Sequence, residues 1–137
     1  MVLYETFDHE ADVGIRGYGK TLEESFEHGA EALFSVMVDL GAVQPSVRKE
    51  VTCDAPDPEL LFVEWLNTLL TLAHLEGMVF RQFKVEITGN ELRGVAWGER
   101  LDRERHHPEC EVKAATYCML KIGHGEGLYT AQCVVDV

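Results

Sequence analysis

Acidic side chains crowd a short stretch near the start of the sequence, where Asp8, Glu10 and Asp12 alternate with other residues. In an extended backbone all three would point to one side, and a bend would still leave two or three carboxylates close together. Like charges repel one another unless a cation or a lysine neutralises them, and hard oxygen ligands suit Ca²⁺ or Mg²⁺. The stretch is therefore a candidate cation site, and the alternative is an acidic turn that faces water.

The end of the sequence, residues 134–137, offers two more carboxylates in an apolar, strand-like context. One is the side chain of Asp136, and the other is the main-chain carboxylate of Val137. If this segment lies beside a strand at 11–18, Asp12 and Asp136 meet in one oxygen-rich pocket. If it does not, Asp136 is a solvated residue on a buried strand.

A lysine accompanies these acids in the segment 111–117. Strand-like alternation would put Glu111, Lys113 and Ala115 on one side. Lys113 could then neutralise nearby carboxylates or contact a phosphate. The alternative is a surface salt bridge that contributes little to stability.

Histidine and cysteine also lie close together, in HHPEC at 106–110. A structural zinc site needs a second pair of ligands, which the sequence does not supply, so zinc is disfavoured. The four cysteines form no CxxC pair and are expected to be reduced thiols in a cytosolic protein. The sequence also lacks four common enzyme motifs: the phosphate-binding loop GxxxxGK[ST], the dinucleotide-binding GxGxxG, the nucleophile motif GxSxG of α/β-hydrolases and the zinc-binding HExxH.

These candidate residues need elements to position them. Two helices are predicted, one from Thr21 to about Met37 and one at 58–76 that is apolar on most sides. Thr21 and Glu24 have capping-box spacing at the first helix start. Strands are expected at 4–7, 11–18, 46–53, 79–88, 91–97, 110–122 (with a break) and 129–137, and 99–109 is expected to be a long exposed loop. This order favours an α+β fold, a two-layer sandwich with both helices on one face of a mixed or antiparallel sheet.

Length and charge limit the partners. The 137 residues suit a single domain, 1–137. The net charge of −12 repels RNA, so no direct nucleic-acid binding is expected, and any role in RNA chemistry should act through a basic protein partner or a metal. The sequence has no signal-peptide pattern and no apolar run long enough to span a bilayer, so a cytoplasmic location without membrane contact is expected.

Several collinear segments together resemble the archease family. DHEADVG at 8–14 and GKTLEESF at 19–26 are similar to its opening, usually DHTADVGI followed by G-x-TLEEAF. LFVEWLN at 61–67 resembles its second helix, and Gly98 and Glu99, with Asp102 and His106 after them, resemble its GE-containing loop. EVKAATY at 111–117 and VVDV at 134–137 are similar to its lysine segment and its terminus.

The resemblance implies a compact α/β fold and an accessory role without catalysis of its own. Archeases help the RtcB-type RNA ligase of tRNA splicing to form its guanylylated intermediate and to turn over repeatedly. The resemblance also implies that Asp12, Asp136 and Val137 hold a divalent cation. Calcium is expected, with magnesium or manganese as alternatives. Lys113 matches the lysine of the family's EVKA segment. The resemblance also implies a functional acidic residue early in the first helix, for which Glu24 is chosen and Glu23 and Glu27 are the alternatives.

Two positions depart from the family pattern. Glu10 stands where threonine is usual and adds a charge near the expected site, and Cys118 stands where many relatives have histidine. Two other functions stay open. A small metal-dependent hydrolase could use the same carboxylates, although two-metal sites usually need more ligands. A general chaperone or interaction module would need no cation.

Overall fold

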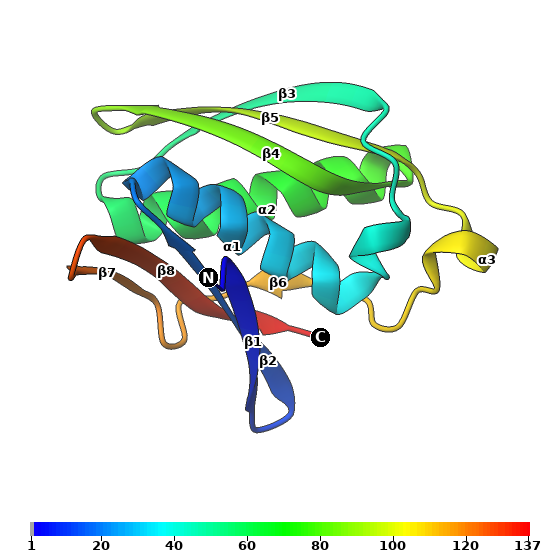
Figure 1. Ribbon diagram of the computed structural model, residues 1–137, viewed down its shortest axis with the longest axis horizontal. Helices are drawn as coiled ribbons and strands as arrows, with labels where there is room; N and C mark the ends of the chain where they lie inside the picture. Colours follow the sequence, from blue (N-terminus) through cyan, green and yellow to red (C-terminus); the bar gives the residue numbers. More distant parts are fainter. Residues whose placement is uncertain (1) are drawn as a thin grey trace.

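The strands form two antiparallel sheets, and the two long helices lie between them (Figure 1). The computed structural model describes residues 2–137. The first sheet, named here the terminal sheet, contains β1 (Tyr4–His9), β2 (Asp12–Gly19), β8 (Leu128–Asp136) and β6 (Ala114–Ala115) in that order, and β7 (Lys121–Gly125) also pairs with β8. The three-stranded sheet has the order β3 (Val47–Asp54), β5 (Glu91–Arg100) and β4 (Met78–Thr88).

The α+β class and the antiparallel pairing are confirmed, but the arrangement has one more layer than predicted. Helix α1 (Leu22–Met37) packs on β2 and β8 of the terminal sheet and on β4 of the other sheet. Helix α2 (Pro58–Glu76) packs on β3, β4 and β6. The all-round apolar surface of α2 requires cover on both sides, and hydrophobic periodicity does not reveal which sheet each strand joins.

Local signals explain where the helices begin and end. Thr21 caps α1, because its hydroxyl accepts a hydrogen bond from the backbone N–H of Glu24 at 3.1 Å. Asp57 caps α2 in the same way through the N–H of Leu60 at 2.8 Å. Gly77, with φ of 63°, ends α2 in the left-handed conformation that glycine adopts without strain.

The predicted strand at 110–122 and the predicted loop at 99–109 are corrected in detail. In the segment 110–122, strand pairing is limited to β6 and β7, with a turn between them. In the segment 99–109, β5 runs on to Arg100, and a short helix, α3 (Arg103–His106), follows. No helix within residues 2–137 is long and apolar enough to cross a membrane.

Close packing of α1 on the terminal sheet depends on small residues. A Cβ atom added to Gly17 of β2 would lie 2.2 Å from the backbone nitrogen of Gly29 and 2.3 Å from the carbonyl oxygen of Ser25, both in α1. Backbone atoms cannot move aside as the end of a flexible side chain can. The strand and the helix therefore approach each other as closely as glycine permits.

Gly17→Ala should therefore lower the free energy of unfolding by about 3 kcal/mol, because the strand and helix must separate. Urea denaturation measures the change. Gly125→Ala is the matched control, since a Cβ there would meet no described atom within 4 Å, and it should change stability by less than about 0.5 kcal/mol. Equal stabilities for the two variants would contradict the packing argument.

Candidate functional site

The register of β2 and β8 brings the beginning and the end of the described chain together. The two strands are antiparallel, and their last pair at this end is Val13 with Val135. One residue further along come Asp12 and Asp136, and residues opposite each other in such a pair share a face with Cβ atoms about 5 Å apart. In addition, the backbone N–H of Val137 donates to a carboxylate oxygen of Asp12 at 3.3 Å.

The acidic stretch at 8–14 folds as a hairpin that projects beyond the helices (Figure 1). Glu10 lies exposed at its tip with φ of 56°. In β1, His9 pairs with Asp12 and Asp8 pairs with Val13, so Asp8 and Asp12 lie on opposite faces. The single row of Asp8, Glu10 and Asp12 expected for an extended backbone does not form, because the chain bends here, which is the alternative that the sequence allowed. Asp12 shares its face with His9 instead.

Lys113 lies beside the last strand. Its backbone N–H donates to the carbonyl oxygen of Asp136 at 2.8 Å, and its side chain is exposed. Glu111 and Lys113 are exposed on either side of the buried Val112, as the predicted alternation requires, but Ala115 is buried and departs from it. The alternation breaks where the regular strand β6 begins, at Ala114.

Asn67 of α2 holds the short strand β6 and was not among the predicted functional residues. Its amide nitrogen donates to the carbonyl oxygen of Ala115 at 3.2 Å, and its amide oxygen accepts from the N–H of Ala115 at 2.8 Å. Both main-chain groups of Ala115 are thereby satisfied by one side chain. The signal that could have identified it is a polar amide between the buried Leu66 and the buried Leu69 of α2, where a side chain needs a hydrogen-bond partner.

Glu24 does not lie with the other predicted residues. Its carboxylate accepts from the backbone N–H of Lys20 at 2.7 Å at the start of α1, beside Gly19. Gly19 follows Asp12 by seven residues of extended strand, which corresponds to about 23 Å. Glu24 therefore caps the helix at the far end of β2.

The carboxylates of Asp12, Asp136 and Val137 are hard oxygen donors of the kind that Ca²⁺, Mg²⁺ and Mn²⁺ prefer. The hydrogen bond from Val137 engages one oxygen of Asp12. Among residues 2–137, no three His, Cys, Asp or Glu side chains are grouped so that they could hold a metal ion. A cation would thus require the main-chain carboxylate in addition to the two aspartates. The donor chemistry suits a hard cation and not zinc.

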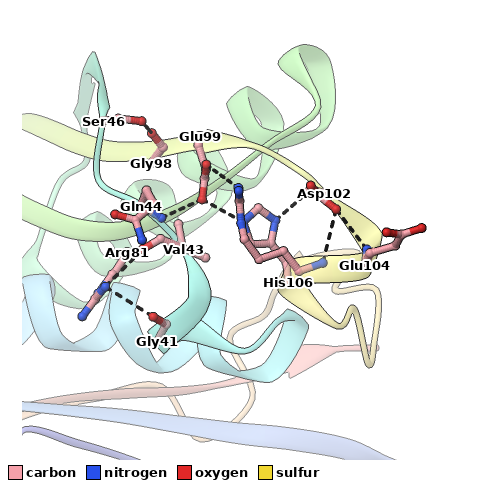
Figure 2. Close-up of polar contacts among 11 residues, drawn as sticks. Gly41, Val43, Gln44, Ser46, Arg81, Gly98, Glu99, Asp102, Glu104 and His106 are labelled. Atoms are coloured by element: carbon pink, nitrogen blue, oxygen red, sulfur yellow. Dashed lines mark hydrogen bonds and ion pairs between the residues drawn. The ribbon is translucent and has the colours of Figure 1, made fainter.

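A buried histidine organises the segment that leads to Lys113 (Figure 2). His106 is fully buried, although its segment was expected to be an exposed loop. Its Nδ1 accepts from the backbone N–H of Asp102 at 2.8 Å, so the ring proton must sit on Nε2. Nε2 then donates to the Glu99 carboxylate at 2.9 Å. The imidazole is held as one neutral tautomer.

Glu99 joins three separate parts of the chain. Its carboxylate accepts from the backbone N–H of Gln44 at 2.7 Å and from His106 (Figure 2). It also accepts from the Arg105 guanidinium at 2.5 Å. Burial by itself would raise the pKa of Glu99. The hydrogen bonds from Gln44 and His106, with the positive charge of Arg105, outweigh this effect and lower the pKa. The carboxylate is thus ionised where it lies.

Beyond His106 the chain is attached to α1 and the core at a few points before it reaches Lys113. The carbonyl of His106 accepts from the N–H of Asp39, and the N–H of Glu109 donates to the carbonyl of Met37. Val112 is completely buried. The position of Lys113 is therefore set by these attachments and by its own bond to Asp136.

Comparison with known proteins gives one consistent result. A family model described as the archease protein family matches residues 4–137. Two proteins named "Protein archease" are similar over all of both chains, one from Pyrococcus abyssi at 44% identity and one from Sulfurisphaera tokodaii at 41%.

Solved structures agree. A solution structure from Methanobacterium thermoautotrophicum has a TM-score of 0.87 at 37% identity and matches 98% of this chain and 99% of its own. The crystal structure of a Thermotoga maritima protein, described as "an archease, possible chaperone", has a TM-score of 0.63 at 21% identity over 97% of this chain and 96% of its own. The second likeness concerns the fold alone.

The network around Glu99 makes a testable contribution to stability. Glu99→Gln should lower the free energy of unfolding by about 1–3 kcal/mol at pH 7, because the amide cannot accept from all its donors as the carboxylate does. The folded pKa is lowered, so this stabilisation is present above the unfolded pKa of about 4.3 and is lost as pH falls through the folded value.

Urea denaturation at a series of pH values should therefore show the two proteins converging in acid. Glu91→Gln is the control. Because Glu91 forms an exposed ion pair with Arg93, this substitution should change the free energy of unfolding by close to zero. A Glu99→Gln deficit that does not change with pH would contradict the assignment.

Proposed function

The chain belongs to the archease family, and we propose that it activates an RtcB-type RNA ligase of tRNA splicing by promoting ligase guanylylation and multiple turnover. The role is an accessory one, and the bond-forming chemistry belongs to the ligase. The observation that supports the proposal is the meeting of Asp12 with the end of β8, where the Val137 N–H bonds the Asp12 carboxylate. A surface that joins the two ends of the chain is suited to present several carboxylates together.

We propose that Asp12, Asp136 and the main-chain carboxylate of Val137 hold a divalent cation, calcium first and magnesium or manganese as alternatives. A bound cation supplies positive charge that offsets the repulsion among these groups and attracts phosphate oxygens. The protein's own part is positional. Pairing with β2 and with β6 holds the end of β8 on both sides. The exposed Lys113 side chain adds a second positive group that can approach a nucleotide phosphate.

The net charge of −12 favours a basic protein partner over direct contact with RNA. The acidic hairpin tip and the carboxylates of Asp12 and Asp136 lie at the same end of the strands of the terminal sheet. A metal-dependent ligase active site that binds nucleotide and RNA phosphates needs positive charge. The two surfaces are therefore complementary, which supports docking of the activator near that active site.

Asp12→Asn and Asp136→Asn should each reduce ligase–GMP adduct formation by about tenfold or more, because the oxygen set loses a charge. The assay combines purified ligase and GTP with and without this protein. Asp54→Asn is the control, since this exposed aspartate ends β3 of the other sheet, and it should stimulate fully. Full stimulation by both site variants would rule out the pocket.

The same preparations distinguish the rival functions. Hydrolysis of nucleotides or phosphoesters by the protein alone, lost in Asp12→Asn, would favour a metal-dependent hydrolase. A general chaperone, as the Thermotoga maritima protein is described, would suppress aggregation of unrelated clients and would not respond to divalent cations.

The role of the Val137 carboxylate has a separate test. One glycine appended after Val137 moves that carboxylate by about 3.5 Å while every side chain stays in place. Calcium affinity, measured by titration calorimetry, should fall by about tenfold or more. Val137→Ala, which keeps the carboxylate, should bind calcium within about twofold of the unmodified protein. Equal affinities for all three proteins would exclude the main-chain ligand.

A further inference from the structure

A tight turn between β6 and β7 is fixed to the last strand. The N–H of Leu120 donates to the carbonyl of Tyr117 at 3.2 Å and closes the turn. Two further bonds attach it to β8, from Val134 N–H to the Cys118 carbonyl at 3.0 Å and from the Gln132 amide to the Met119 carbonyl at 3.1 Å. These hydrogen bonds hold the backbone of the turn in place against β8.

This fixed turn displays two large apolar side chains to solvent. Tyr117 is 69% exposed and Met119 is 47% exposed. Met119 also has φ of 53°, a conformation that residues other than glycine seldom adopt and that persists where surroundings impose it. Neither side chain contributes much burial to folding. Tyrosine and methionine are enriched at protein interfaces, and anchors that are already ordered lose little entropy on binding.

The turn lies next to the acidic site. The sulfur of Cys118 is 3.9 Å from Nε2 of His9, and His9 pairs with Asp12 across the hairpin. Cys118 therefore lies on the face of the hairpin that carries His9 and Asp12, and the end of β8 with Asp136 lies beside it. Asp8 lies on the opposite face, and Glu10 is exposed at the hairpin tip. The basic side chains around this region are Lys113, before the turn, Lys121, at the start of β7, and Arg16, which donates to the Gln132 amide oxygen at 2.9 Å and pairs with Glu5.

We propose that Tyr117 and Met119 are the apolar anchors of a docking surface for a basic protein, with the acids of the hairpin and of β8 providing charge complementarity. The inference rests on the proposed function, and the partner is the RNA ligase. Each anchor fills an apolar recess among basic residues of that partner. Such an arrangement matches known binding energetics, in which a few aromatic side chains dominate affinity and surrounding charges steer association.

The charges also decide between protein and RNA as the occupant. Tyrosine can stack on single-stranded bases, but such sites line their backbone track with positive charge. Arg16 beside this turn is already paired with Glu5, so Lys113 and Lys121 stand against Glu10, Asp12 and Asp136, and the whole chain carries −12. A protein surface with lysine and arginine around an apolar recess is the complementary occupant.

Calorimetric titration of purified ligase with Tyr117→Ala and with Met119→Ala tests the surface. Tyr117→Ala should weaken binding by about tenfold or more, and Met119→Ala by a smaller factor. Leu75→Ala is the matched control, because Leu75 is 80% exposed on the last turn of α2, and it should bind within about twofold of the unmodified protein. Adduct formation should recover at saturating Tyr117→Ala, since the anchors act on affinity.

The outcomes separate the two proposals. If the unmodified protein stimulates the ligase and both alanine variants bind as tightly, the docking surface is overturned and the function stands. If the unmodified protein binds without stimulating and Tyr117→Ala binds more weakly, the surface stands and the activator role is overturned. Absence of binding overturns both. Labelled RNA that binds the protein and is lost in Tyr117→Ala overturns the assignment to a protein partner.

Discussion

The antiparallel pairing of β2 with β8 determines where the rest of the candidate site can lie. The register from Val13 with Val135 to Gly19 with Tyr129 sets the last residues of the sequence beside the first hairpin. The same pairing builds the surface on which α1 packs, so a shift by one residue would move Ile15 and Cys133 out of the core. Hydrophobic burial therefore fixes the register, and the register in turn fixes which acids meet.

A second, polar constraint holds the irregular part of the site. The buried His106 and the carboxylate of Glu99 connect β5, the segment after α1 and the short helix α3. From there the chain reaches Lys113 with few attachments and enters the terminal sheet only at β6. The two constraints act on opposite sides of β8. Apolar packing positions Asp12, while a network of hydrogen bonds positions the lysine.

The sequence allowed the local elements to be predicted better than their assembly. Capping at Thr21, the apolar face of α1 and the strand-like end at 134–136 followed from residue type and spacing. The division of the strands into two sheets did not, because a period of two residues is the same whichever neighbour a strand has. Asp8 lies on the other face from Asp12 because a turn at Glu10 interrupts the extended backbone, and the sequence had left the choice between extended backbone and bend open.

Burial of His106 was missed for a related reason. The segment 99–109 is rich in charge, and such composition favours solvent exposure unless each buried polar atom finds a partner. Both ring nitrogens of His106 find partners, but those partners are a main-chain N–H and the Glu99 side chain. Whether a buried histidine finds such partners depends on which groups lie next to it in the folded protein, and a single sequence does not show that directly. The family resemblance pointed to Asp12, Asp136 and Lys113, which the fold does place side by side.

The position of β8 in the chain has a consequence for biosynthesis. It is the last of the described strands to be synthesised, and yet it completes the surface that covers β2 and one side of α1. The helices and the three-stranded sheet occupy 22–100 and can associate earlier, while Ile15 and its neighbours wait without their partner. A nascent chain at that stage exposes a strand edge and apolar surface that the finished protein conceals. A chain that lacks β8 would thus be prone to aggregation, even though most of its helices and strands are present.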